Sequence, residues 1–186
     1  NIPYQIVRGV EFYNRKEIRD LLAYLKVLVN PADEGAMLRI INTPRRGIGK
    51  TTIDRLRAYA DSAGISLYEA LRKGEEIGSL GKAPKSKIAA FVDMVESFRK
   101  DPTDSVASLA ERVYRESGLA EALQTLGSEG QNAIENVDEL INGMARYDRQ
   151  AEEPSLVDYL QQIALFSDAD TYEPDRGAVA LMTLHA

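Results

Sequence analysis

The chain has 186 residues, a formal net charge of −6 and 44% hydrophobic residues, which is enough for one domain with a hydrophobic core. It contains no cysteine and a single histidine, His185, so disulfides, thiolate metal sites and histidine-based triads are excluded. No apolar run approaches the roughly 18–20 residues that span a bilayer, and we expect no signal peptide. We therefore expect a cytoplasmic protein without membrane contact.

A strand and a helix are predicted at the start of the chain. Residues 4–10 alternate weakly between apolar and polar side chains, which predicts a short strand. Asn14, followed by Glu17 three residues later, has the pattern of a capping box at a helix start. Apolar residues then recur at helical spacing over 18–29, and the pair Asn30-Pro31 ends this helix.

Two helices are predicted on the C-terminal side of a glycine-containing turn at 43–52. Thr51 has the side chain of a good N-cap, and Gly64 closes the first helix. Ser66 caps the second and shorter one. Residues 74–84 are rich in glycine and charged side chains, and we expect them to form the most mobile loop.

The remaining pattern predicts a mainly helical domain between two strands. A nearly continuous apolar run at 178–184 is typical of a buried parallel strand. The simplest arrangement is a helical insertion into a neighbouring α/β domain, with both ends cut from a longer protein. Further helices are predicted over 33–41, 86–99, 105–117, 133–147 and 155–166.

The stretch at residues 43–52, TPRRGIGKTT, carries most of the functional information. Gly49, Lys50 and Thr51 match the end of a Walker A loop, whose backbone wraps the phosphates of a nucleotide. The full loop needs a further glycine at the position of Pro44, which has no backbone N–H and a fixed φ. The sequence therefore indicates a compact Gly-Ile-Gly turn instead of a nucleotide-binding loop.

Positive charge gathers around this turn. Residues 43–57 hold five basic residues and one acidic residue, a local charge of +4, so the remainder carries −10. Glycines permit close approach of the backbone to a ligand, and the start of the following helix favours an anion. We expect Ile48 to insert into the core, and Arg46 and Lys50 to reach adjacent phosphates of duplex DNA without reading its bases. A plain turn between two helices, with solvated basic side chains, is the alternative.

Catalytic candidates are weak. Glu135, Asp138 and Glu139 lie near one another on one predicted helix, and Glu11 and Glu17 near another, which is the usual pattern of a solvated face. Aromatic residues could stack on the bases of a single strand, but their spacing favours core positions. These aromatic residues are Tyr4, Phe12, Tyr13 and Tyr24.

Several segments together resemble one family, the bacterial UvrD/PcrA/Rep DNA helicases of superfamily 1. They occur in the order and at the spacing of that family, over essentially the whole chain. The segments are IPY at 2–4, RGVEFY at 8–13, RKEIRD at 15–20, LAYL at 22–25, RIINTPRRGIG at 39–49, IENVDEL at 134–140 and LMTLHA at 181–186.

The resemblance implies a mainly α fold, a multi-helix helicase 2B-type domain with short terminal strands that belong to a RecA-like α/β neighbour. Residues 14–176 would form the helical 2B subdomain. Residues 1–13 and 177–186 would be flanks of the 2A subdomain, the second at the start of motif V. The parent would be an ATP-dependent 3′–5′ DNA helicase that uses ATP and Mg. This chain would hold no catalytic residue, cofactor or metal, because it contains no Walker A, Walker B or arginine-finger segment.

The resemblance also assigns residues to DNA. Thr183 and His185 would touch the single strand in the intact parent. Arg8 stands where the family usually has glycine, so the local turn there is expected to differ. The implied contacts with duplex DNA are Thr43, Arg45, Arg46, Gly47, Ile48, Gly49, Lys50 and Thr51.

The implied partners are double-stranded DNA, single/double-strand junctions and the RecA-like subdomains of the helicase, in a bacterial, nucleoid-associated protein. In this family the 2B subdomain swivels, and hinges are expected near Gly9 and at 175–177. An alternative function is a regulatory module that binds repair or transcription proteins and has little direct contact with DNA.

Overall fold

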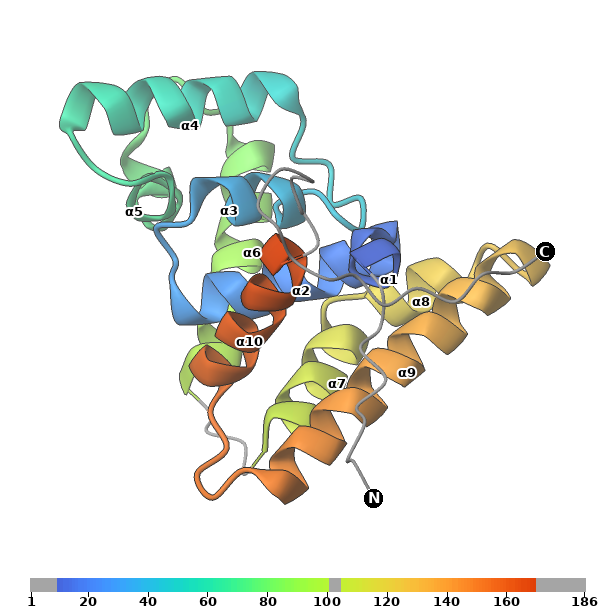
Figure 1. Ribbon diagram of the computed structural model, residues 1–186. Helices are drawn as coiled ribbons and strands as arrows, with labels where there is room; N and C mark the ends of the chain where they lie inside the picture. The colour runs from blue at the N-terminus through green and yellow to red at the C-terminus, as the bar shows by residue number, and fades with distance from the viewer. Residues whose placement is uncertain (1–9, 101–104, 170–186) are drawn as a thin grey trace, which may run out of the picture.

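The computed structural model describes residues 10–100 and 105–169. Within these ranges the chain is helical and contains no strand, which confirms the predicted mainly α fold (Figure 1). The two predicted terminal strands lie outside the described residues, except for Val10, which begins a helix. No described helix is both long and apolar enough to cross a membrane.

Eleven helical elements follow one another in the described residues. They are α1 (Val10–Asn14), α2 (Lys16–Val29), α3 (Glu34–Ile40), α4 (Lys50–Ala63), α5 (Leu67–Arg72), the 3-10 helix η1 (Gly74–Glu76), α6 (Lys82–Lys100), α7 (Val106–Glu116), α8 (Leu119–Gln124), α9 (Ser128–Gln150) and α10 (Leu156–Ala169).

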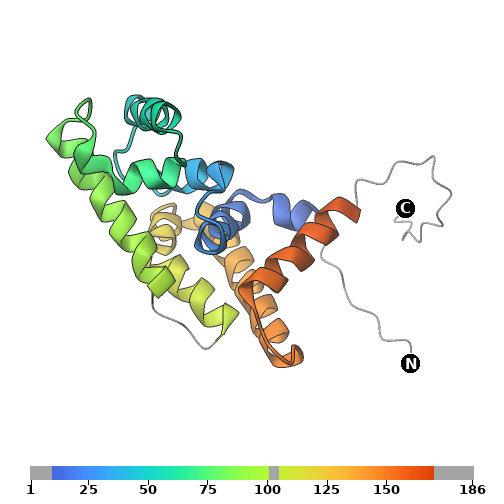
Figure 2. The same cartoon turned by 90° about the vertical axis from the view of Figure 1, so that its left-hand side faces the viewer.

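The helix α2 is the centre of the core. Its side chains at Ile18, Leu21, Tyr24 and Leu25 are fully buried. It packs against α3 on one side and against α7 and α9 on the other, and it also contacts α6 and α10. In Figure 1 α3 and α4 lie above it, whereas α7 and α9 run side by side below. Figure 2 shows α6 and α10 on opposite sides of the molecule. A segment that contacts α2 is therefore linked through it to most of the core.

Two predicted helix caps are wrong, and α6 and α9 begin at Lys82 and Ser128, before the predicted 86 and 133. Asn14 is the last residue of α1 instead of a cap, and the carboxylate of Glu17 accepts a hydrogen bond at 2.7 Å from the Asn136 side chain on α9. Thr51 lies inside α4, because the helix begins at Lys50 and its N-cap is Gly49. In both places a side chain with capping ability stands within two residues of the true start, and sequence alone does not fix such boundaries.

The predicted mobile loop at 74–84 is largely ordered. Gly74–Glu76 forms η1, and the side chains of Ile77 and Leu80 are buried in the core. The helix α6 already begins at Lys82, since a proline in the first turn, here Pro84, is compatible with helical geometry. The buried apolar side chains hold this segment against the core, although it is rich in glycine.

The predicted cap at Ser66 is confirmed. Its hydroxyl accepts a hydrogen bond from the N–H of Glu69 at 3.2 Å, and the Glu69 carboxylate accepts one from the N–H of Ser66 at 2.9 Å. These two bonds form a capping box. The hydrogen bonds that the Ser66 N–H and hydroxyl donate to the Glu69 carboxylate lower the pKa of this carboxyl. Gly64 closes α4 in the left-handed conformation with φ 63°, as predicted.

Candidate functional site

The Gly-Ile-Gly turn connects α3 to α4 and is held by hydrogen bonds to the side chain of Asn42. The Asn42 side-chain oxygen accepts hydrogen bonds from the N–H groups of Arg46, at 2.8 Å, and Ile48, at 3.3 Å. The Ile48 side chain is completely buried, which confirms that it inserts into the core. The segment from Asn42 to Ile48 is therefore an ordered part of the fold.

The Arg46 side chain points into the molecule. Its Nη1 atom donates to the carbonyl oxygens of Ile40 at 3.0 Å, Thr43 at 2.9 Å and Pro44 at 3.3 Å. These carbonyls lie at the end of α3 and in the turn itself, where helix geometry leaves acceptors without an internal donor. The Ile40 carbonyl also accepts from the Thr43 N–H at 3.0 Å, so the guanidinium adds a second donor there and ties the turn to the end of α3.

The other nitrogen of the same guanidinium reaches distant elements. Arg46 Nη2 donates at 2.6 Å to the Tyr24 hydroxyl on α2 and at 2.6 Å to the carbonyl of Ser117, the C-cap of α7. The guanidinium also lies over the rings of Tyr24, at 5.8 Å, and Phe91, at 5.6 Å. The expectation that this side chain reaches a phosphate is therefore corrected, because its donors are used inside the protein.

Tyr24 completes this network. Its ring is fully buried, and its hydroxyl donates to the Thr43 carbonyl at 2.6 Å. Burial raises the pKa of the Tyr24 hydroxyl to about 12, although the Arg46 charge acts in the opposite direction. The hydroxyl therefore keeps its proton at neutral pH and remains a donor to the turn. Tyr24 is thus a core residue, and Phe12 and Tyr13 are half-buried against the core, whereas Tyr4 lies outside the described residues.

The structural requirement for glycine differs between the two glycine positions of the turn. Gly47 has φ +73°, which side chains rarely adopt, and a Cβ there would overlap the ammonium group of Lys87. Gly49 has φ −86° and ψ 175°, and a Cβ there would meet nothing within 4 Å. The fold therefore requires a glycine at 47 but not at 49. Because Gly49 has no side chain, a ligand in solvent has room to approach its backbone closely.

The start of α4 is open to solvent at the same place. Gly49 is its N-cap and makes no side-chain cap, and Lys50 and Thr51 occupy the first two helical positions, whose N–H groups have no acceptor within a helix. The helix is long enough to carry a positive dipole end at these groups. Exposed N–H groups, a dipole end and no covering side chain are the features of an anion-binding backbone.

The basic side chains around the turn differ in how far their charges are neutralised. Lys50 pairs with Asp54 at 2.8 Å, and Arg57 pairs with Glu34 at 2.8 Å. Arg55 donates to the Ser79 carbonyl at 2.6 Å, a contact that leaves its charge uncompensated. Arg45 is exposed. The predicted local excess of positive charge is thus partly cancelled on α4 and persists at Arg45.

Sequence reasoning missed three residues that the fold brings to the turn. Tyr24 and Ser117 bind Arg46, and Lys87 of α6 donates to the Gly47 carbonyl at 3.4 Å. No local spacing links these positions to the turn, because Ser117 is 71 residues from Arg46 and Lys87 is 40 residues from Gly47. The one signal in the sequence was the basic run KAPKSK at 82–87.

The turn does not fit the triphosphate of a nucleotide. A phosphate loop presents consecutive N–H groups to the ligand, whereas here the N–H groups of Arg46 and Ile48 donate to Asn42 and Pro44 has none. Residues 10–100 and 105–169 contain no group of three or more His, Cys, Asp or Glu side chains that could hold a metal ion. The backbone of this turn therefore does not fit the phosphates of a nucleotide.

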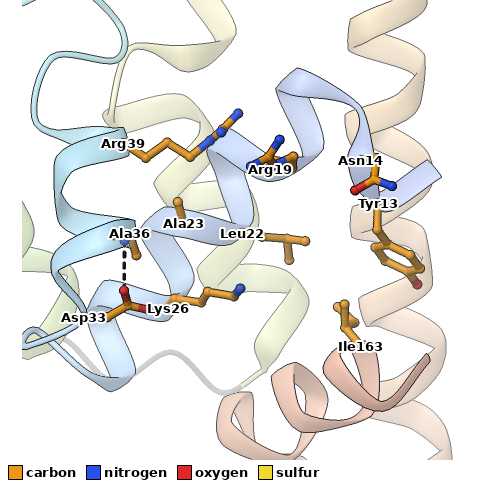
Figure 3. A pocket seen from close by; sticks show the side chains of 11 residues that line it. Tyr13, Asn14, Arg19, Leu22, Ala23, Lys26, Asp33, Ala36, Arg39 and Ile163 are labelled. Carbon is orange, nitrogen blue, oxygen red and sulfur yellow. Dashed lines mark hydrogen bonds between the residues drawn. The ribbon is translucent and has the colours of Figure 1, made fainter. Parts of the chain in front are cut away.

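A second feature is a hollow of about 450 Å³ between α2, α3 and α10 (Figure 3). Figure 3 shows Arg19 and Arg39 on one side of it and Lys26 with Asp33 on the other. Asp33 is the N-cap of α3, and its carboxylate accepts a hydrogen bond from the Ala36 N–H at 2.9 Å. This carboxylate therefore stabilises the start of α3. Arg39 pairs with Asp20 at 2.8 Å, so the positive charge of the rim comes from Arg19 and Lys26, and the floor of the hollow includes apolar side chains.

The carboxylates considered for catalysis are exposed or take part in ordinary surface contacts. Glu139 lies 3.4 Å from Arg146 on the same helix, and Glu135 accepts from Gln131 at 3.3 Å. Glu11 and Asp138 are exposed. The predicted single-strand contacts at 183 and 185 lie outside the described residues.

Comparison with known proteins places the whole chain in one group. Residues 1–186 match the family model described as UvrD-like helicase C-terminal domain. The chain is similar to proteins named ATP-dependent DNA helicase PcrA: it is 35% identical over 190 residues to that of Staphylococcus epidermidis and 34% identical over 193 residues to that of Bacillus subtilis. The PcrA of Leuconostoc citreum is 36% identical over 194 residues. Each alignment covers 100% of this chain and 26% of the relative, so the chain spans about a quarter of the length of the curated relatives it matches.

Proposed function

Because the chain belongs to the family of UvrD-like helicase C-terminal domains, we propose that it is the helical 2B subdomain of an ATP-dependent 3′–5′ DNA helicase. Residues 14–176 form this subdomain in the proposal, and 1–13 and 177–186 belong to a RecA-like neighbour. ATP and magnesium are bound by other parts of the parent. Thr183 and His185 contact the single strand there, and the subdomain modulates activity by swivelling about its flanks.

The proposed role of the subdomain is to hold the backbone of duplex DNA near the unwinding junction. The observation that carries this role is the open start of α4 at Gly49, where the fold itself does not require a glycine. A phosphate fits against the N–H groups of Lys50 and Thr51, within reach of the Lys50 ammonium. Arg45 and Thr43 flank this position along the turn.

Arg46 and Ile48 have a different part in this proposal. Their side chains are directed into the protein and their N–H groups donate to Asn42, so they hold the backbone of the turn in place and act on DNA only indirectly. Contacts with phosphates carry no sequence information. The proposed grip is therefore independent of base sequence, which suits a protein that moves along DNA.

The Gly49→Asp, Lys50→Glu double variant tests this grip. Aspartate is a preferred N-cap residue, Gly49 has free space around it, and an acidic residue in the first turn suits the helix dipole. The variant should therefore fold at least as stably as the wild type. It places two negative charges where the phosphate would lie, so we expect duplex affinity to fall by about 10-fold to 100-fold at low salt. The salt slope should fall by about 0.9 for each phosphate that the protein no longer neutralises.

Binding is measured with the 186-residue chain and a short blunt-ended duplex, by fluorescence anisotropy across a salt series and by amide NMR shifts. A Gln161→Glu, Lys100→Glu variant is the matched control, because it changes the net charge equally at exposed positions away from the turn. Equal affinity and salt slope for wild type and the Gly49 variant would rule out a grip through this turn. Equal losses in both variants would show a general charge effect instead.

A second candidate function is a module that binds repair or transcription proteins, and the cationic hollow of Figure 3 favours it. Arg19 and Lys26 project from α2 beside the apolar side chain of Ile163. A rim of positive charge around an apolar floor suits an acidic segment with an apolar side chain.

This second function predicts a different response to charge reversal. An Arg19→Glu, Lys26→Glu variant should lose binding to an acidic, leucine-containing model peptide by about 10-fold, since two favourable charge pairs become repulsive. The same variant should keep most of its duplex affinity, because both changes lie away from the turn. Calorimetric titration with the peptide, beside anisotropy with the duplex, separates the two functions. An unchanged peptide affinity would count against the hollow as a binding site.

A further inference from the structure

Lys87, in the second turn of α6, rests against the Gly-Ile-Gly turn. Its ammonium group lies 3.4 Å from the Gly47 carbonyl oxygen. It also occupies the space that a Cβ on Gly47 would need, so the two residues are in direct contact. Lys87 is nevertheless exposed. A basic side chain from a distant helix therefore lies on the outer surface of the turn.

The charge of Lys87 is left without a counter-ion. Lys50 and Arg57 are each paired with a carboxylate at 2.8 Å, whereas within 10–100 and 105–169 no carboxylate is described beside Lys87 or Arg45. A carbonyl oxygen at 3.4 Å gives a long hydrogen bond and does not neutralise the ammonium charge. Two uncompensated positive charges thus lie close to Gly47 in a protein whose net charge is −6.

The neighbouring lysine on the same helix is different. The Lys85 ammonium donates to the carbonyl of Glu75 and is directed towards η1. Of these two lysines, Lys87 is the one directed towards the turn. Its position follows from the packing of α6 against the core and not from the local sequence of the turn.

We propose that Lys87 is a second contact for the phosphate backbone of duplex DNA, so that the duplex is held between the α3–α4 turn and α6. This inference rests on the proposed function of the turn and extends it to an element that the motif does not include. A lysine ammonium acts as a point charge with rotatable donors, so it can move from the Gly47 carbonyl to a phosphate oxygen without a change in the backbone. Such a contact adds affinity and orientation without sequence preference.

The experiment compares Lys87→Gln, Lys87→Arg and Lys100→Gln in the 186-residue chain with a short blunt-ended duplex. Lys100 is the matched control because it lies on the same helix with its side chain 76% exposed. We expect Lys87→Gln to lower duplex affinity about 3-fold to 10-fold at low salt and to reduce the salt slope by about 0.9, the value for one phosphate. Lys87→Arg should retain both values, and Lys100→Gln should change affinity by less than Lys87→Gln.

Three outcomes would overturn the inference. The first is an unchanged affinity and salt slope in Lys87→Gln. The second is an equal loss in Lys87→Gln and Lys100→Gln, which would indicate a general effect of charge. The third is a shift of the Gly47 and Ile48 amide signals in free Lys87→Gln together with an unchanged salt slope, which would show a structural role only. Failure of the proposed function itself looks different: wild type and the Gly49→Asp, Lys50→Glu variant would then respond identically to the duplex.

Discussion

Replacing Arg46 by alanine is expected to lower the free energy of unfolding by about 3–5 kcal/mol, a loss of the size that accompanies the breaking of a buried polar network. The substitution removes a donor to the carbonyls of Ile40, Thr43 and Ser117 at once, although Ile40 still accepts from the Thr43 N–H and Thr43 from the Tyr24 hydroxyl. It also removes one of the two partners of the buried Tyr24 hydroxyl and the cation above the Phe91 ring. Each polar group left unsatisfied adds its own desolvation cost, so the loss exceeds that of a single hydrogen bond.

Chemical denaturation of the 186-residue chain measures this loss. Arg45→Ala is the matched control, since the neighbouring arginine is exposed and its removal should change stability by no more than about 0.5 kcal/mol. Arg46→Lys should recover only a small part of the loss, because an ammonium group cannot supply the planar fork of donors that reaches carbonyls on several sides. If Arg46→Ala and Arg45→Ala were equally stable, the inward network would not hold the fold together.

Arg46 also shows what sequence reasoning could not supply. In the run TPRRGIGK the two arginines are adjacent, and both fit a phosphate-binding interpretation. Only the fold separates them: Arg46 donates to a carbonyl 71 residues away, whereas Arg45 is exposed. A contact across that distance leaves no periodicity and no spacing by which a single sequence could reveal it.

The helices were predictable where their determinants are local. The apolar spacing of α2 and the capping box at Ser66 lie within one helix each, and both are observed. The helix α8 was missed because it is only six residues long, too short to show a helical period. Helix starts were misplaced where two neighbouring residues could both cap, as at Gly49 and Thr51.

Part of the candidate site was also predictable from the sequence. The Gly-Ile-Gly motif located the turn, and the burial of Ile48 followed from an apolar residue between two glycines. The different roles of Gly47 and Gly49 depend on φ and on the Lys87 side chain, and neither is encoded in the motif. Whether the turn grips DNA stays a prediction that the variants above test.

Ile48→Ala is expected to destabilise the chain by about 2–4 kcal/mol. The side chain is completely buried at a point where the backbone on both sides is exposed, so the truncation leaves a cavity that a turn fixed by Asn42 and Arg46 cannot readily fill. Ile53→Ala is the matched control, because Ile53 is the same residue type on α4 but only half-buried. Denaturation of both variants should show the larger loss at position 48, and equal losses would contradict the anchoring role.

The same pair of variants links the fold to the proposed grip. Ile48 is the one side chain between Gly47 and Gly49, and its burial fixes the direction in which the N–H groups of Lys50 and Thr51 point. At temperatures where both variants remain folded, Ile48→Ala should therefore also weaken duplex binding by about 10-fold through loss of this preorganisation. Ile53→Ala should bind the duplex like the wild type, because it leaves the turn in place. Loss of stability without loss of affinity in Ile48→Ala would mean that the duplex itself can order the turn, and that Lys50 acts by charge alone.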